Sequence, residues 1–257
     1  MIFSVIGGDK RTEYLRSKLL KDGHKLTYQS SDADIIIMPM PLTADGIHIL
    51  NTDIEIDEYL RKLPKDILVF GGGNREGVID YSKDNSLAAL NAIPTAEGAL
   101  ALAIENTSAV LWKSRCLVVG SGRIGKYLSG LLKAMGSYVT LSSRREEDRV
   151  YSMIWGYSHA YTNNLLEIIS DQDIIFNTVP SRVIGEAELS RLKQSALIIE
   201  LSSKPYGVDL EMASQMGVKT ILASGLPGKV APQSAGEIIG ETIYRLISEM
   251  RGKSAER

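Results

Sequence analysis

Cysteine and histidine are scarce in this chain. Cys116 is the single cysteine among 257 residues, so an internal disulfide is excluded. It begins the apolar run CLVVG, where a buried strand thiol is expected rather than a nucleophile. The three histidines, His24, His48 and His159, share no spacing that is typical of metal ligands. We therefore expect no metal site.

An excess of charge of either sign is also absent. Lysine and arginine together number 29, and aspartate and glutamate 31, which gives a formal net charge of -2. A nucleic-acid-binding protein would carry a basic excess, and a solvating tail would carry an acidic run. We therefore expect no nucleic-acid partner.

Segments that direct a chain to a membrane are lacking as well. The start, MIFSVIGGDK, has neither the basic region nor the long apolar region of a signal peptide. No continuous apolar run reaches the roughly 18 residues that cross a bilayer. These absences favour a cytoplasmic protein without a membrane segment.

Short apolar runs alternate with amphipathic stretches along the chain, a pattern typical of α/β folds with parallel sheets. In the first part, the runs predict strands over Ile2–Ile6, Lys25–Gln29, Ile35–Met38 and Ile67–Phe70. A helix is predicted over Thr12–Lys21. A second α/β series runs from Cys116 to Leu222, and an amphipathic helix follows over Ser234–Met250.

The strongest motif is GSGRIG, which follows the buried strand Leu117–Val119 and opens an amphipathic helix. That context is the one dinucleotide binding needs, although a glycine-rich turn without a ligand is the alternative. Gly120 would permit the tight turn, Gly122 would let a pyrophosphate approach the backbone, and Gly125 would let helix and strand pack closely. The predicted cofactor contacts in this turn are Gly120, Ser121, Gly122, Arg123, Ile124 and Gly125.

The residues after the next strand, Tyr138–Leu141, indicate which dinucleotide binds. NAD enzymes usually place an acidic residue there for the ribose hydroxyls. The four residues of this chain are Ser142, Ser143, Arg144 and Arg145. Hydroxyl and guanidinium groups suit a 2′-phosphate, so NADP is the predicted cofactor. The alternative is a solvated, charged helix start.

Two doubly wound parallel-sheet domains are therefore predicted. Pro94 would open a long linking helix that continues to Trp112, because proline suits the first turn of a helix. The first domain, residues 1–93 together with 232–257, would be flavodoxin-like and bind the substrate. The second, residues 94–231, would contain the linking helix and an NADP-binding Rossmann fold.

Two further loops follow strands of the second domain. One comes after Asp173–Phe176 and the other after Leu197–Glu200. Both would lie near the nicotinamide and its ribose, because parallel strands end at one edge of the sheet. Small polar residues before a proline are also ordinary turn chemistry. The predicted cofactor contacts are Thr178, Val179, Pro180 and Ser202.

Substrate groups are expected mainly beside helix starts. Arg11 follows a strand and a glycine turn, where it would hold a carboxylate or would be an ordinary surface arginine. Thr95 and Glu97 lie in the linking helix, beside the cleft expected between the domains. The segment 225–232 is predicted to be a hinge-like loop that covers the nicotinamide or only joins the domains. The predicted substrate contacts are Asp9, Arg11, Thr95, Ser203 and Gly228.

Six segments together resemble the dipicolinate synthase A subunits of endospore-forming bacteria. They are VIGGDKR, NAIPTAEGALALAIENT, VVGSGRIGKYL, FNTVPS, ELSSKPYGVD and GLPGKVAPQSAGEI. The resemblance covers nearly the whole chain, and the IPTAEG and GLPGKVAP segments are more specific than a glycine motif. The chain is short for that family, mainly in the first domain, and Lys204 stands where an arginine is expected.

The resemblance implies a function. It implies NADP-dependent oxidation of a dihydrodipicolinate to the aromatic dipicolinate, in the mother cell of a sporulating bacterium. The implied partners are a small dicarboxylate substrate and a flavoprotein-like B subunit, with self-association left open. Arg11 would meet a substrate carboxylate, and Glu97 would accept the proton that aromatisation releases.

Two other functions remain open. Shikimate dehydrogenase and methylenetetrahydrofolate dehydrogenase have a similar two-domain layout, but their lysine-based catalytic pairs are not evident in the first domain here. Alternatively, the chain is a non-catalytic NADP-binding scaffold for a partner protein. Turnover by the isolated chain separates an enzyme from a scaffold.

Overall fold

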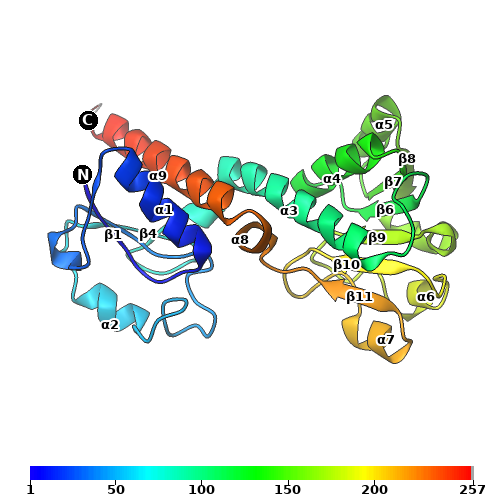
Figure 1. Cartoon of the computed structure of the whole chain (residues 1–257), viewed down its shortest axis with the longest axis horizontal. Helices are drawn as coiled ribbons and strands as arrows, with labels where there is room; N and C mark the ends of the chain where they lie inside the picture. The colour runs from blue at the N-terminus through cyan, green and yellow to red at the C-terminus, as the bar shows by residue number, and fades with distance from the viewer. Residues whose placement is uncertain (256–257) are drawn as a thin grey trace. The chain divides into compact units, whose positions relative to one another are not determined.

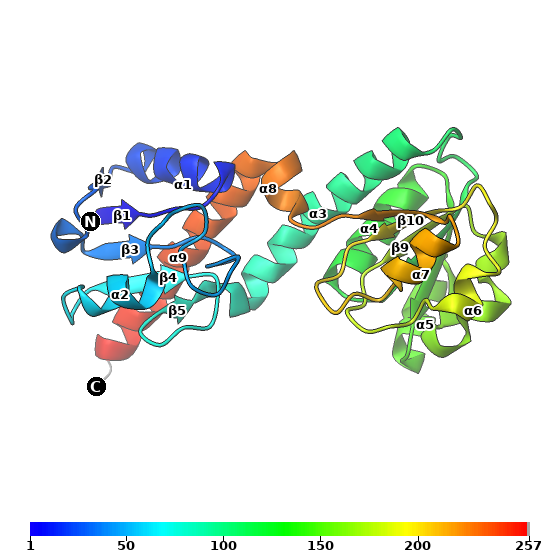
Figure 2. The same cartoon turned by 90° about the horizontal axis from the view of Figure 1, so that it is seen from below.

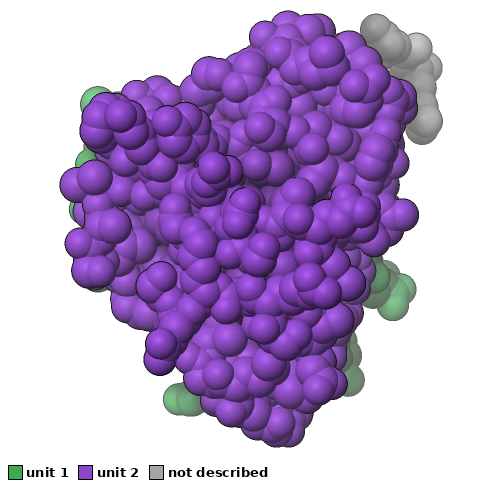
Figure 3. All heavy atoms as spheres, turned by 90° about the vertical axis from the view of Figure 1, so that its right-hand side faces the viewer, with its two compact units in different colours: residues 1–91, 227–257 green, residues 92–226 purple. Residues whose placement is uncertain are grey.

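The computed structural model describes residues 1–255, and side chains up to residue 252. The chain divides into two compact units, which Figure 3 shows in different colours. Unit 1 consists of Met1–Asn91 and Pro227–Arg257, and unit 2 of Ala92–Leu226. The divisions fall near the predicted boundaries at Ile93–Pro94 and Ala231–Pro232. Each unit contains one parallel sheet with helices on both faces.

The sheet of unit 1 has five parallel strands in the order β2-β1-β3-β4-β5. These are β1 (Ile2–Val5), β2 (Lys25–Leu26), β3 (Ile35–Ile37), β4 (Leu68–Gly71) and β5 (Ile79–Asp80). This is the flavodoxin-like strand order of doubly wound sheets. The predicted α/β class with doubly wound parallel sheets is confirmed for this unit.

Side chains that alternate along each strand build two cores in unit 1. Ile35 and Ile37 pack on the face that carries α1 (Lys10–Lys21) and α9 (Pro232–Ala255), whereas Ile36 faces the side of α2 (Ile56–Arg61). Figures 1 and 2 show α9 lying along α1, far from it in sequence. The two helices approach closely at glycines of α9.

The sheet of unit 2 has six parallel strands in the order β11-β10-β9-β6-β7-β8. These are β6 (Arg115–Val119), β7 (Tyr138–Ser143), β8 (Ser158–Tyr161), β9 (Ile174–Asn177), β10 (Leu197–Glu200) and β11 (Lys219–Leu222). Read from β6, this is the Rossmann order, and it reverses between β6 and β9. The Rossmann prediction is therefore confirmed.

Helices cover both faces of this second sheet. They are α3 (Asn85–Asn106), α4 (Arg123–Ala134), α5 (Glu146–Trp155), α6 (Glu186–Leu189) and α7 (Leu210–Gln215), with 3-10 turns at Thr162–Glu167 and Ile169–Asp171. Val118 and Leu128 belong to the core on one face, and Leu117 and Leu165 to the core on the other. The central strands β9 and β10 are consequently apolar up to their last residues, Asn177 and Glu200, as expected for a sheet buried on both sides.

The linking helix α3 differs from its prediction. It begins at Asn85 and ends at Asn106, so Pro94 lies inside the helix instead of opening it. The start is set by Asp84, whose Oδ1 accepts a hydrogen bond of 2.8 Å from the Leu87 amide. The stabilisation from burying helix residues before and after Pro94 outweighs the loss of the one backbone hydrogen bond that a proline removes. Leu87 is buried in a core of unit 1, and Ala96 in a core of unit 2.

The composition of α3 also bears on the membrane prediction. Among the described residues, α3 is the one helix long and apolar enough to cross a membrane, by length and composition alone. A search for continuous apolar runs misses it because Pro94 and Glu97 interrupt its run. Its residues Ala96, Ala99 and Ala103 are packed in a core of unit 2. A buried core helix of this kind meets the same criterion.

The segment 225–232 is not the loop that was predicted. Residues Leu226–Val230 form the short helix α8, and α9 begins at Pro232. Glycine and proline suggested a loop, but Pro227 and Pro232 lie in the first turns of the two helices, where a missing N–H is harmless.

Candidate functional site

A pocket of about 360 Å³ lies at the carboxyl end of the sheet in unit 2. It is formed by the turn after β6, the end of β7 with the start of α5, Thr162, and the loop after β9. Its lining residues are Gly120, Ser121, Gly122, Ser143, Arg144, Arg145, Asp148, Thr162, Thr178, Val179, Pro180, Ser181 and Val183. Because β6 and β9 are neighbours where the strand order reverses, the pocket occupies the switch point at which such sheets bind ligands.

Two glycines of the turn are required by packing. Gly120 has a φ of 103°, and a Cβ there would lie 2.4 Å from the Thr178 Oγ1. A Cβ on Gly125 would lie 1.9 Å from the Gly120 carbonyl oxygen. Helix α4 and strand β6 therefore pack as closely as the motif predicts.

Gly122 differs from the other two because a Cβ there would meet no atom within 4 Å. It is the N-cap of α4, and as a glycine it has no side chain with which to cap the first turn. A helix start that opens onto a pocket suits an anion such as a pyrophosphate. The lining contains neither Arg123 nor Ile124, and the Ile124 side chain packs against a core of unit 2. The Ile124 side chain therefore offers a ligand in the pocket no contact, and contacts from these two positions stay a prediction.

The two serines at the end of β7 have different surroundings. Ser142 is fully buried, and its Oγ lies 2.9 Å from the Thr162 Oγ1, so the prediction of a ligand contact from its side chain is wrong. Ser143 lines the pocket and lies 2.9 Å from the Nε2 of His159. Burial lowers the pKa of His159, and the charge of Arg149 lowers it further.

Asp148 is a pocket residue that the sequence reasoning missed. It is 2% exposed, and its Oδ2 accepts hydrogen bonds from the Ser121 Oγ (2.7 Å) and the Arg145 Nε (2.9 Å). Its Oδ1 accepts a third from the Arg145 Nη2 (3.0 Å). Burial opposes ionisation of Asp148, but these bonds and the charges of Arg145 and Lys126 outweigh it and hold its pKa below the usual value.

This pairing separates the two predicted arginines. Arg145 directs the paired donors of its guanidinium at Asp148, so that face is not available to a ligand. Arg144 is exposed and lines the same pocket. Its side chain has no hydrogen bond or ion pair within the part of the chain that the structure describes. Arg144 is thus the arginine that can meet a phosphate with its whole guanidinium.

The two loops predicted to meet the nicotinamide differ in access. Thr178, Val179 and Pro180 line the pocket, and the Thr178 Oγ1 donates to the Val119 carbonyl at 2.8 Å. Ser202 is buried and is not among the lining residues, whereas Ser203 is exposed. The first loop therefore lines the pocket, and the second does not.

Three predicted substrate residues lie together in unit 1. Asp9 caps the start of α1, and its carboxylate pairs with Arg11 through Nε (2.9 Å) and Nη2 (2.8 Å). Arg11 is only 9% exposed and also donates to the Met40 carbonyl. A Cβ on Gly228 would lie 3.0 Å from both the Arg11 Nε and the Asp9 Oδ2.

The ion pair changes what Arg11 offers to a ligand. Burial opposes ionisation of Asp9, but the bonds and charge of Arg11 outweigh it and hold the pKa of Asp9 below its usual value. Among the described residues, the hydrogen bonds of the Arg11 side chain come from Nε and Nη2. Its Nη1 makes no hydrogen bond within the part of the chain that the structure describes.

Thr95, Glu97 and Ser203 belong to unit 2 and do not line its pocket. Thr95 is half-buried on α3, and Glu97 is exposed on the same helix. Exposure leaves the Glu97 carboxylate accessible to solvent. A role for these three residues remains a prediction.

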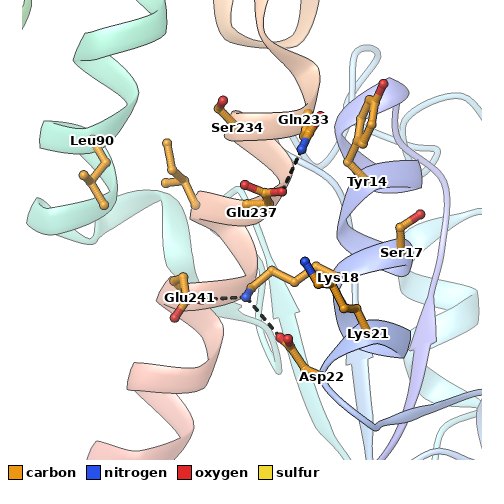
Figure 4. A pocket seen from close by; sticks show the side chains of 11 residues that line it. Tyr14, Ser17, Lys18, Lys21, Asp22, Leu90, Gln233, Ser234, Glu237 and Glu241 are labelled. Atoms are coloured by element: carbon orange, nitrogen blue, oxygen red, sulfur yellow. Dashed lines mark hydrogen bonds and ion pairs between the residues drawn. The ribbon is translucent and has the colours of Figure 1, made fainter.

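A larger cavity, of about 670 Å³, lies against helices α1 and α9 of unit 1 (Figure 4). Its central cation, Lys18, forms ion pairs with Asp22 at 3.0 Å and with Glu241, and the Glu241 bond raises the pKa of Lys18. Gln233 similarly donates to Glu237 at 3.1 Å. These groups satisfy one another, so we do not place the functional site there.

The chain is similar to known oxidoreductases. Residues 100–205 match the family described as D-isomer specific 2-hydroxyacid dehydrogenase, NAD binding domain. Over 241 residues the chain is 30% identical to the dipicolinate synthase A subunit of Bacillus subtilis (strain 168), covering 87% of this chain and 80% of that protein.

Solved structures show the same likeness. The crystal structure of the A component of dipicolinate synthase from Bacillus subtilis superposes with a TM-score of 0.86 at 26% identity, covering 98% of this chain and 97% of that one. The corresponding structure from Bacillus halodurans gives a TM-score of 0.87 at 24% identity, with 95% and 97% covered. A transhydrogenase from Sinorhizobium meliloti shares the fold, with a TM-score of 0.75 at 14% identity and coverage of 97% and 94%.

Proposed function

Since this chain belongs to the family of dipicolinate synthase A subunits, we propose that it oxidises dihydrodipicolinate to dipicolinate with NADP. The family and its NAD-binding domain make the chain an oxidoreductase that uses a pyridine nucleotide. The reaction would belong to the class that oxidises CH–CH or CH–NH groups. It removes one hydride and one proton from the ring, which leaves the aromatic product.

The observation that carries this proposal is the pocket at the switch point of unit 2. Gly122 leaves open space beside the start of α4, and the N-terminus of a helix suits a pyrophosphate. Val179 and Pro180 line the same pocket on the side of β9. The residues present therefore fit a dinucleotide, whose nicotinamide would accept the hydride when bound.

The preference for NADP rests on Arg144. Its guanidinium lines the pocket beyond the end of β7. In Rossmann folds this is where the adenosine ribose lies, whose 2′-position carries the phosphate in NADP. Asp148 is the acidic residue in the lining of this pocket, and NAD enzymes use an acidic residue to bind the ribose hydroxyls. Its oxygens are already bonded to Arg145 and Ser121, which supports phosphate recognition instead of hydroxyl recognition.

The substrate side is proposed from unit 1. Arg11 would hold a substrate carboxylate through Nη1, while Asp9 fixes the rest of the guanidinium and Gly228 leaves room beside it. Thr95 and Ser203 are the other proposed substrate contacts. Glu97, an exposed carboxylate, is the proposed proton acceptor.

A partner and a location follow from the same family. We propose that the chain works with a flavoprotein-like B subunit, because its relative is named as one lettered component of a synthase. We also propose that it acts in the cytoplasm of the mother cell during sporulation. The competing function is that of a scaffold without turnover.

Turnover tests the proposal directly. The purified chain, with and without the B subunit, is supplied with dihydrodipicolinate and either NADP or NAD. Reduced nicotinamide and aromatic product should form together, only when substrate and oxidised cofactor are both present, and faster with NADP. Glu97→Gln should lower kcat by roughly 10²-fold or more if Glu97 is the base.

Each other outcome has a definite meaning. Failure of the wild type with and without the B subunit would sink the assigned reaction. Turnover only in the presence of the B subunit, with unchanged NADP binding, would favour the scaffold. Equal rates with NADP and NAD would reject the 2′-phosphate site.

A further inference from the structure

Glu200, the last residue of β10, is a carboxyl group buried without a cation. It is 0% exposed, and no ion pair involves it within residues 1–252. Both of its oxygens accept hydrogen bonds from neutral N–H groups. The donors are the Asn177 Nδ2 (2.8 and 2.9 Å), the Ser202 amide (2.8 Å), the Gly207 amide (3.0 Å) and the Val208 amide (2.9 Å).

These donors belong to two loops, residues 177–184 and 201–209, which we call the paired loops. The amides of Val183 and Ile184 both donate to the Gly207 carbonyl, at 2.9 and 3.0 Å. A Cβ on Gly207 would lie 2.3 Å from the Asn177 Nδ2 and 2.4 Å from the Val179 carbonyl oxygen. The loops therefore lie in contact, and Glu200 bonds to both of them.

Only one of the paired loops reaches the pocket. Thr178, Val179 and Val183 line it, whereas the second loop has its exposed residues at Ser203, Lys204 and Pro205. A Rossmann sheet binds one nucleotide with each half, and β9 and β10 belong to the half opposite the strands β6–β8. The paired loops thus serve the nicotinamide half of the cofactor under the proposed function.

The hydrogen bonds that Glu200 accepts offset the cost of burying it. Burying a carboxyl group without a counter-ion opposes folding, but an apolar residue of similar size would leave these N–H donors buried without an acceptor. What the carboxylate adds is direction, because N–H groups from separate segments converge on its two oxygens. A satisfied buried polar network fixes one arrangement of the segments that it joins.

We propose that Glu200 is a positioning residue that fixes the paired loops against each other and so orients the nicotinamide half of the cofactor. The inference rests on the proposed function. It assigns no chemistry to Glu200, whose side chain does not line the pocket. The adenosine half, held beyond β7, is independent of it.

The test compares whole cofactor with its adenosine half. Glu200→Gln keeps the shape but turns an NH₂ group toward N–H donors, which should loosen the paired loops. Calorimetric titration should give NADP binding weakened roughly tenfold and adenosine 2′,5′-bisphosphate binding unchanged, and single-turnover hydride transfer should slow by about 10²-fold, as misplaced reacting groups do. Asn177→Ser, whose shorter side chain should not reach Glu200 and which keeps the backbone donors, should show the same pattern more weakly.

Three outcomes overturn the inference. Unchanged NADP binding and hydride transfer in Glu200→Gln would do so. Equal weakening of both ligands would reveal a general structural role. If Glu200→Gln does not fold, Asn177→Ser carries the test, and equal behaviour toward both ligands would then decide against the proposal. Wild-type protein that binds neither ligand contradicts the proposed function itself, which keeps the two failures apart.

Discussion

The two halves of unit 2 hold a buried carboxylate in opposite ways. Beyond β7, Asp148 is 2% exposed, but its partner Arg145 has a side chain that is 63% exposed. Beyond β10, Glu200 is surrounded by neutral N–H groups of the backbone and of Asn177. The first arrangement lies open to solvent on the arginine side, because the Arg145 side chain is largely exposed. The second cannot change without moving two loops.

The difference matches the tasks of the two halves under the proposed function. The adenosine half must distinguish a 2′-phosphate from a hydroxyl, which is a matter of charge. The nicotinamide half must hold a ring in one orientation, which is a matter of fixed backbone. One repeated α/β architecture thus supports recognition by charge on one side and orientation by geometry on the other.

The largest effect is expected from a substitution of Gly125, which should weaken binding of the whole cofactor and of its adenosine half together. In Gly125→Ala the added Cβ meets the Gly120 carbonyl oxygen, which is backbone and cannot give way cheaply. Overpacking of this kind destabilises by about 3 kcal/mol, and the shifted turn should lose NADP and adenosine 2′,5′-bisphosphate alike. Chemical unfolding and titration of both ligands measure it.

Gly122→Ala is the matched control for that substitution. Its Cβ enters open space, so the free energy of unfolding should stay close to that of the wild type. The same methyl group would occupy the approach of a pyrophosphate, so binding should weaken in a folded protein. Strong binding by either variant would argue that the turn does not hold the phosphates.

The next largest effect is expected from Arg144 and Arg145, and it tests whether charge in the adenosine half distinguishes NADP from NAD. Arg144→Ala should weaken NADP binding roughly ten- to hundredfold, since a charge-assisted hydrogen bond contributes about 1.5–3 kcal/mol. NAD binding should hardly change. Arg145→Ala frees Asp148 instead. The unpaired carboxylate would repel a 2′-phosphate and could accept from ribose hydroxyls, so NADP binding should weaken less than in Arg144→Ala and NAD binding should hold or strengthen. The reverse ranking in calorimetry would show that Arg145 leaves Asp148 for the phosphate.

Much of the fold could be predicted because it depends on residues close in sequence. Strand β10 lies over the predicted residues Leu197–Glu200, and the glycine turn is placed as its motif requires. Helix α3 could not be placed so well. Its start depends on a cap by Asp84. The helix continues past Pro94 because the helical residues before and after the proline are buried in the two units. Strand β2 ends at Leu26 rather than Gln29, because only Lys25 and Leu26 pair with β1.

The candidate site shows the same limit. The burial of Ser142 depends on Thr162, which comes from the segment after the neighbouring strand. Asp148 was detectable, since its spacing of three residues from Arg145 is that of a helical ion pair. Glu200 also left a signal, an acidic residue at the end of the apolar strand LIIE. Which groups it meets depends on loops that only the folded chain brings together.

The smallest expected effect is the acid sensitivity of Asp148. Its folded pKa lies below the ordinary value of 3.8, so an unfolded chain takes up this proton at a higher pH than the folded one. The contribution of the pair is complete above the unfolded value and is lost as pH falls through the folded one. Asp148→Asn cannot titrate, so the difference in unfolding free energy between wild type and variant should be constant near neutral pH and shrink below about pH 4.

Urea unfolding of both proteins at several pH values measures that difference, which we expect to be about 1 kcal/mol because Arg145 is largely exposed. Added salt should reduce it further, since exposed charges are screened. The difference between wild type and Glu200→Gln should resist salt, because Glu200 meets no charged partner among the described residues. Equal salt dependence of the two differences would contradict the contrast between a carboxylate held by charge and one held by backbone.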